Sequence, residues 1–168
     1  MDHSYILPFI KSITNVFETM LQSHVSVGKP SLKASGSPCY DVSGIIGMSG
    51  DVVGTIILSF KTDAAESIVA LFCGEKLESG SPDFADAVGE LVNMVSGGAK
   101  AQFTDTKDVS ISCPSVIVGK DHGVALPSDV PCVVIPCTTD CGEFVIEVAI
   151  REAGATAGAA ANNASASA

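Results

Sequence analysis

Glu90 and Asn93 lie three residues apart in the stretch FADAVGELVNMVSGGAKA, which spans residues 84–101. On a helix that turns about 100° per residue, this spacing puts the carboxylate and the amide on one face, one turn apart. A carboxylate can pair with a cation, and an amide oxygen can accept a hydrogen bond from a water molecule. Glu and Asn are also common on solvent-exposed helix faces, so the pair alone does not distinguish a functional site from an ordinary exposed surface.

The glycines of this stretch need a physical explanation, because glycine in a helix interior costs roughly 1 kcal/mol relative to alanine. On the helical wheel, Gly97 falls on the same face as Glu90 and Asn93, and so does Asp86. A missing side chain at Gly97 would let another backbone approach Asn93 closely. The opposite stripe is apolar and is predicted to face the core through Phe84, Val88, Leu91, Val95 and Ala99.

The rest of the chain must hold this helix in place. Residues 5–24 show the apolar spacing of an amphipathic helix. The β-branched segments 39–48 and 52–60 predict one hairpin, and 130–139 with 143–151 predict a second. The segment 28–38 reads as a loop with room for a short edge strand, and residues 109–119 read as one strand.

Two helix starts and one helix end can also be read from the residue types. Thr62 is expected to cap a short helix that Gly74 ends, and Ser81 followed by Pro82 is expected to start the helix of Glu90 and Asn93. The order helix, hairpin, short helix, helix, hairpin predicts an α+β fold. In this fold an antiparallel sheet carries helices on one face and is built from two related, pseudo-symmetric halves.

The charge balance excludes several function classes. The 168 residues include 9 Lys plus Arg against 19 Asp plus Glu, for a formal net charge of -10, and the basic residues are scattered singly. Such a surface repels a polyanion, so we expect no nucleic-acid partner. Arg151 is the one arginine of the chain, which leaves little to grip a phosphate group directly. The Cys-x5-Arg, DxDx[TV] and phosphate-loop motifs are absent.

The six cysteines are interpreted as small hydrophobic residues of a reducing compartment. Cys132, Cys137 and Cys141 cluster in the chain but form no CxxC and have no histidine beside them, so we predict no metal site. No cationic leader and no membrane-length apolar run is found, and we therefore expect a cytoplasmic protein with no membrane contact.

The chain is predicted to divide into one folded domain, residues 1–151, and a disordered tail, residues 152–168. Residues 153–168 are rich in Ala, Ser, Gly and Asn and contain neither a charge nor a large apolar side chain. Such a segment buries too little apolar surface to offset its loss of conformational entropy.

The string DAVGELVNMVSGG, set between two helix-plus-hairpin units, closely resembles the signature of the CheX/CheC family of chemotaxis phosphatases. The segments ITNVFETML and SCPSVIVG resemble the first helix of CheX and the strand that follows its motif helix. The resemblance extends over about residues 5–151. CheC-like members carry a second Glu-x-x-Asn on the first helix, whereas here Glu18 is followed three residues later by Leu21, so the resemblance implies one site per chain, as in CheX.

The resemblance implies a cytoplasmic enzyme that hydrolyses the aspartyl phosphate of a CheY-like response regulator. Glu90 and Asn93 would be its catalytic residues, and Asp86, Gly97 and Gly98 would contact the partner. The enzyme would have no cofactor of its own, with Mg²⁺ held by the receiver domain, and it would form a homodimer.

The two motif residues suit this chemistry. Phosphoryl transfer passes through a loose transition state, so a catalyst needs mainly to hold a water in line with the scissile bond. The amide of Asn93 would orient the water, and Glu90 would pair with a lysine of the receiver. Two other hypotheses stay open: a non-catalytic module that binds a receiver or a flagellar-switch component, and a dimeric structural domain.

Overall fold

The computed structural model describes residues 3–103 and 107–155. Within these residues the strands are β1 Ser26–Val27, β2 Ser31–Leu32, β3 Tyr40–Gly50, β4 Val52–Phe60, β5 Val109–Ile111, β6 Ser115–His122, β7 Val133–Thr139 and β8 Gly142–Glu152. All are paired antiparallel in one sheet of order β1-β7-β8-β4-β3-β5, with β2 also on β7 and β6 also on β3. Both predicted hairpins, β3–β4 and β7–β8, are confirmed.

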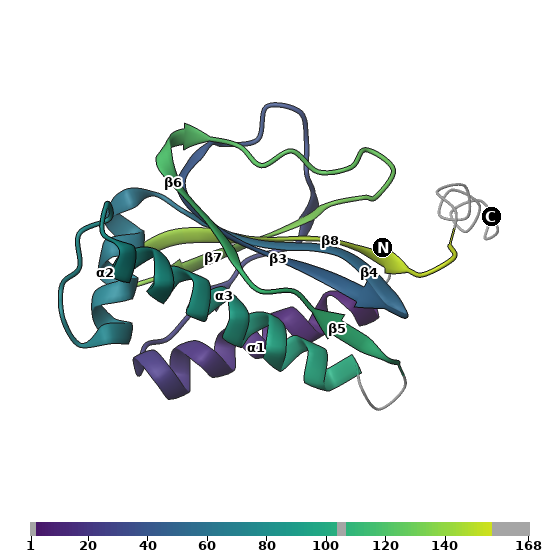
Figure 1. Ribbon diagram of the computed structural model, residues 1–168, viewed down its shortest axis with the longest axis horizontal. Helices are drawn as coiled ribbons and strands as arrows, with labels where there is room; N and C mark the ends of the chain where they lie inside the picture. Colours follow the sequence, from purple (N-terminus) through teal and green to yellow (C-terminus); the bar gives the residue numbers. More distant parts are fainter. Residues whose placement is uncertain (1–2, 104–106, 156–168) are drawn as a thin grey trace.

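Three helices cover one face of this sheet: α1 Leu7–Val16, α2 Thr62–Cys73 and α3 Pro82–Phe103. In Figure 1 they lie below and beside the sheet, while the segments that join β2 to β3 and β6 to β7 pass over its other face. The α+β class with helices on one face is therefore confirmed. The first helix is shorter than the predicted 5–24, because α1 becomes a π-helical turn at Phe17–Leu21 and Gln22 ends it in the left-handed conformation.

The predicted pseudo-symmetry appears in the topology of the sheet. The central pair is β4 with β8, one strand from each hairpin. The short strands β1 and β2, which precede the first hairpin, pair with β7 of the second hairpin. In the same way β5 and β6, which precede the second hairpin, pair with β3 of the first. Each half thus supplies the edge of the other, so neither half can complete its sheet alone.

The core lies between the sheet and the helices. Phe60 of β4 and Phe144 of β8 are paired in register, and their rings stack with centroids 5.2 Å apart. Phe17, from the end of the first helix, stacks on the other side of Phe144 at 5.3 Å. All three rings are almost fully buried. This stack joins the helical layer to the centre of the sheet.

The start of α2 differs from the prediction. The N-cap position is Lys61, and Thr62 is the first helical residue. The cap comes from Asp41 of β3, whose carboxylate accepts hydrogen bonds from Thr62 N (3.0 Å) and Thr62 Oγ1 (3.1 Å) and from Asp121 N (3.1 Å). The backbone N–H groups of Thr62 and Asp121 lower the pKa of Asp41 to about 2. A side chain distant in sequence therefore starts this helix, which no local pattern could show.

The other two helix signals are confirmed. Ser81 Oγ accepts a hydrogen bond from Phe84 N at 3.2 Å, as expected of an N-cap before Pro82. Gly74 ends α2 with a φ of 75°, a left-handed conformation that glycine adopts without strain.

The predicted strand 109–119 is interrupted in the structure. β5 and β6 both pair with β3, but Ser112–Pro114 leave the ladder between them. Pro114 has no N–H to donate to the ladder. Ser112 instead makes two hydrogen bonds with Gly47: its Oγ accepts from Gly47 N, and its backbone N donates to Gly47 O, at 2.9 Å each. The interruption turns Pro114 toward the helical layer, where it matters for the site.

The domain boundary lies slightly beyond the predicted residue 151. β8 includes Glu152, whose carboxylate accepts hydrogen bonds from Tyr5 Oη (2.5 Å) and Lys107 Nζ (2.6 Å). Glu152 was placed in the tail and belongs to the folded domain. Residues 153–155, also placed in the tail, form a turn in which Ala153 N donates a hydrogen bond to Asp51 O (2.9 Å), and residues 156–168 lie outside the described residues. No helix in the described part of the chain is long and apolar enough to cross a membrane.

The cysteines are all free thiols. Cys137 is buried in the core, and this burial raises the pKa of its thiol to about 12. Burial also raises the pKa of Cys132 to about 11, with a further contribution from the nearby negative charge of Glu147. Both thiols are therefore protonated at neutral pH and unsuited to nucleophilic attack.

Candidate functional site

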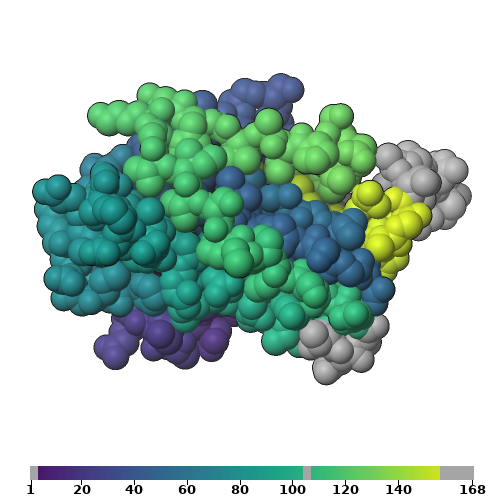
Figure 2. Space-filling view, viewed as in Figure 1, coloured from purple at the N-terminus to yellow at the C-terminus, as the bar shows by residue number. Residues whose placement is uncertain are grey.

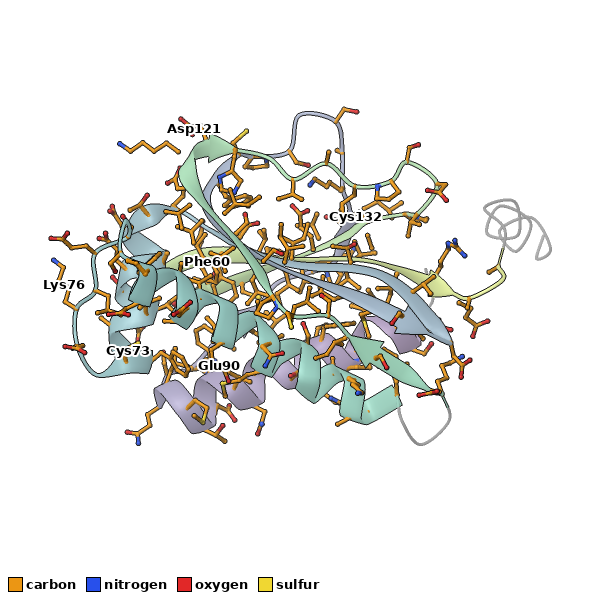
Figure 3. All side chains as sticks on the ribbon, in the orientation of Figure 1. Phe60, Cys73, Lys76, Glu90, Asp121 and Cys132 are labelled. Atoms are coloured by element: carbon orange, nitrogen blue, oxygen red, sulfur yellow. The ribbon has the colours of Figure 1, made fainter. Side chains whose placement is uncertain are left out.

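The site is built on α3, whose two faces agree with the helical wheel. Its apolar stripe is buried against the sheet and comprises Phe84, Val88, Leu91, Val95 and Ala99, none more than 2% exposed. On the opposite face Asp86 and Glu90 are exposed, and Asn93 is half-buried. Figure 3 shows Glu90 on the side of α3 away from the sheet. The structure thus brings the predicted catalytic pair together on one helix face.

Asn93 is more covered than the sequence predicted. It is three residues after Glu90, so it is turned about 60° away from Glu90 around the helix axis. That turn points it toward the side on which Gly89 meets the β5–β6 connection. A Cβ added at Gly89 would lie 3.4 Å from Pro114 Cγ and 3.5 Å from Val116 Cγ2. Figure 2 shows this connection running across the surface next to α3. Asn93 therefore sits at the edge of the open face rather than at its centre.

The two glycines that were expected to face a partner point in different directions. A Cβ added at Gly97 would meet no atom within 4 Å, so this position is open to solvent and to an approaching molecule. A Cβ added at Gly98 would overlap Ser12 Oγ and would lie 3.2 Å from Ser12 Cβ. Gly98 therefore faces α1, and the expectation that it contacts a partner does not fit its position.

Among the described residues, the acidic side chains of the open face form no ion pair. The ion pairs of the described residues are Lys33–Glu147, Lys61–Asp41, Lys61–Asp121 and Lys107–Glu152. Neither Asp86 nor Glu90 belongs to one of them. Because both side chains are exposed and unpaired in the described part of the chain, their charges are available to a cation on another molecule.

The first helix does not provide a second site. Glu18 is exposed, but Leu21 occupies the position where the second motif would place its amide. Leu21 is only 5% exposed and belongs to the core. The π-helical turn also changes the spacing of these residues on the helix surface.

A metal or a built-in nucleophile does not account for the site. Among residues 3–103 and 107–155, no group of three or more His, Cys, Asp or Glu side chains is close enough to hold a metal ion. The open face of α3 offers the carboxylates of Asp86 and Glu90 and the amide of Asn93. These groups can pair with a cation and orient a polar molecule, which suits a site that acts on chemistry supplied by a partner.

Two residues that contact α3 were not predicted from the sequence. Pro114 and Ser12 flank the helix on opposite sides, and neither lies near Glu90 or Asn93 in the sequence. The signal that pointed to them was the unexplained presence of Gly89 and Gly98. A helical glycine indicates close approach, but the sequence does not say which segment approaches.

Comparisons with known proteins show the family of this chain. Residues 42–138 match the family described as "Chemotaxis phosphatase CheX". The chain is 28% identical over 123 residues to the CheY-P phosphatase CheX of Thermotoga maritima, which is 72% of this chain and 79% of that protein.

Solved structures give the same result. A CheC-like superfamily protein from Shewanella sp. PV-4 is 36% identical, with a TM-score of 0.82 over 90% of this chain and 99% of that chain. A chain of the CheX–CheY–BeF3–Mg²⁺ complex from Borrelia burgdorferi has a TM-score of 0.73 at 24% identity, over 88% of this chain and 98% of that chain, and this likeness shows the shared fold. With the family match over more than half of its length, this chain belongs to the CheX family of chemotaxis phosphatases.

Proposed function

We propose that this chain hydrolyses the aspartyl phosphate of a CheY-like receiver domain, with the open face of α3 inserted at the receiver's phosphorylation site. The observation that carries the proposal is the exposed, unpaired position of Glu90 beside Asn93 on that face. Membership of a family of chemotaxis phosphatases supports the reaction, and the T. maritima relative is a CheY-P phosphatase.

Glu90 serves as the docking group in this proposal. Its carboxylate carries no ion pair among the described residues, so it can pair with the lysine that a receiver holds next to its phosphoryl group. Asp86 lies one turn earlier and adds negative charge at the rim, which speeds the encounter of the two proteins. Gly97, open on the same face, lets a loop of the receiver approach the helix backbone.

Asn93 positions the attacking water. Its amide oxygen accepts a hydrogen bond from the water and aims it at phosphorus, opposite the aspartyl leaving oxygen. A neutral amide repels the phosphoryl oxygens less than a carboxylate would. The half-buried position of Asn93 limits the directions in which its amide can point, which favours a fixed water position.

The metal ion belongs to the receiver in this scheme. The B. burgdorferi complex contains CheX, CheY, BeF3 and Mg²⁺. We propose that this chain brings no cofactor of its own and that the Mg²⁺ of the reaction is bound by the receiver. The reaction then takes place in the cytoplasm, where the phosphorylated receiver is formed.

We also propose that the chain forms a homodimer through β6. β6 pairs with β3 along one side, and no strand of the described residues covers its other side. Ile117 and Val118 on this edge are 39% and 42% exposed. An uncovered edge with apolar side chains favours pairing with a second copy. Light scattering of the wild-type chain and of Val118→Lys tests this surface.

The decisive experiment times the decay of a phosphorylated receiver domain with and without the protein. Acceleration that scales with the protein concentration supports the phosphatase. Binding to the phosphorylated receiver without any change in its lifetime favours the alternative, a non-catalytic receiver-binding or flagellar-switch module. Absence of both binding and acceleration would leave a structural domain.

A further inference from the structure

α1 and α3 come close together at Gly98 of α3. Any side chain at this position would overlap the hydroxyl group of Ser12 of α1. Ser12 is itself only 4% exposed, and its Oγ donates a hydrogen bond of 2.7 Å to Val95 O of α3. The absence of a side chain at Gly98 thus makes room for a hydrogen bond between α1 and α3. Its acceptor, Val95 O, lies two residues after Asn93.

Two more close contacts fix α3 on its remaining covered sides. Beneath the helix, a Cβ at Gly44 of β3 would lie 3.0 Å from Val92 Cγ1 and 3.1 Å from its Cβ. On the side opposite α1, Gly89 contacts Pro114. The contacts at Gly98, Gly44 and Gly89 hold the helix from three directions. The fourth direction is the open face with Glu90, Asn93 and Gly97.

A helix held this closely has little freedom to rotate or slide. The placement of a catalytic group matters at the scale of tenths of an ångström, and a misplacement of about 1 Å can cost about 100-fold in rate. The contact with Ser12 differs from the other two because it includes a directional hydrogen bond. It therefore fixes the rotation of α3 about its axis as well as its distance from α1.

We propose that Ser12 and Gly98 are positioning residues for Asn93: the hydrogen bond from Ser12 to the α3 backbone, made possible by Gly98, sets the rotation of α3 that aims the amide at the receiver. This inference rests on the proposed phosphatase function. Ser12 is buried, and the Cβ direction of Gly98 faces α1 rather than the open face, so both act on turnover through Asn93.

The test compares Gly98→Ala and Ser12→Ala with two matched variants. Ser96→Ala also removes a buried hydroxyl, but Ser96 Oγ has no hydrogen-bond partner among the described residues, so its loss should change neither rate nor affinity. Gly98→Ala should lower the maximal dephosphorylation rate about 10-fold while leaving receiver affinity within about twofold. Ser12→Ala should lower this rate by about threefold. Ser12→Gly combined with Gly98→Ala restores the space between the helices but not the hydrogen bond to Val95 O, so its rate should rise from that of Gly98→Ala to about that of Ser12→Ala.

A readout in the free protein separates this inference from the proposed function. The side-chain amide resonances of Asn93 should shift in Gly98→Ala and return toward the wild-type position in the double variant. A wild-type rate and an unchanged Asn93 resonance in folded Gly98→Ala would overturn the inference, as would a fall in melting temperature with the rate per folded molecule unchanged. If the wild-type protein does not accelerate receiver decay, the proposed function fails, and the Asn93 resonance still decides the positioning role.

Discussion

α1 and α3 lie side by side on the same face of the sheet (Figure 1) and occupy matching places in the two halves, yet only α3 presents the residues of a site. A glutamate is exposed in each region: Glu18 in the π-helical turn that follows α1, and Glu90 in α3. Three residues later, α3 presents a partly exposed amide, whereas the first helix buries Leu21 in the core. α3 runs regularly from Pro82 to Phe103, whereas α1 gives way to a π-helical turn after Val16.

The difference shows that a helix serves as a site when it is held firmly on its covered sides and left free on one. α3 meets these conditions through its close contacts with Ser12, Gly44 and Pro114. The end of the first helix has been used for packing instead, because Phe17 and Leu21 fill the core beneath it. In these two related halves, the end of the first helix therefore stabilises the core, and α3 is left to contact the partner.

The largest effect is expected when the first helix is given the motif that it lacks. Leu21→Asn creates Glu18-x-x-Asn but buries a polar group where an apolar one packed, so it should lower the free energy of unfolding by about 3 kcal/mol or more. Met20→Asn is a matched control, because Met20 is 50% exposed and its replacement should cost little. Denaturant unfolding measures both. A stable Leu21→Asn protein with doubled phosphatase activity would refute the division of roles.

Removing the amide from α3 should have the next largest effect. Asn93→Ala should slow dephosphorylation of the receiver by about 100-fold, a loss near 2.7 kcal/mol of barrier lowering, with receiver affinity nearly unchanged. Asn93→Asp should be nearly as slow because of charge repulsion. Asn15→Ala removes an exposed amide from α1 and should keep the wild-type rate. Equal rates for Asn93→Ala and Asn15→Ala would contradict the water-positioning role and favour the binding module.

The two exposed glutamates provide a smaller contrast. Glu90→Gln should weaken receiver binding by about tenfold, near 1.4 kcal/mol, and make the remaining affinity less sensitive to salt. Glu18→Gln removes the same charge from the first helix and should change affinity much less. Titrations of receiver affinity at several ionic strengths give both numbers. A comparable loss in the two variants would show that only the total charge matters.

The smallest effect concerns how α2 and α3 start, and it depends on pH. The folded protein holds the pKa of Asp41 at about 2, below its ordinary value of about 3.9. The ionised carboxylate therefore stabilises the fold above about pH 4, and this stabilisation is lost as the pH falls from about 4 toward 2. Asp41→Asn should lower the melting temperature modestly at neutral pH, with a difference from wild type that shrinks in this range. Ser81→Ala removes a neutral cap, and its effect should be the same across this pH range.

The sequence was informative wherever a structure depends on residues close together in the chain. Both hairpins, the Ser81 cap and the buried stripe of α3 follow from local periodicity and turn residues, and the structure confirms them. Asp41, which caps α2, lies 21 positions before Thr62 in the sequence. Ser12, which contacts α3, lies 86 positions before Gly98. No local sequence pattern could predict these two contacts.

The site shows the same limit. The wheel placed Asp86, Glu90 and Gly97 correctly on the open face, because that face depends on the helix period alone. Gly98 was predicted to contact the partner. A helical glycine indicates that another segment approaches closely, but it does not indicate on which side of the helix. The interruption at Ser112–Pro114 was also missed, because the apolar run continues across it and only the pairing with Gly47 reveals the break.

The central place of β8 has a consequence for how the protein is synthesised. β8 is the last strand of the described chain to leave the ribosome, yet it pairs with β4 from Val52 to Phe60 and supplies Phe144, on which Phe17 and Phe60 both stack. Until residues 142–152 emerge, the nascent chain carries an apolar strand with an open edge at what will become the middle of the sheet. The first half is therefore made early but completes its sheet late, and the newly made chain exposes this edge from the synthesis of β4 until that of β8.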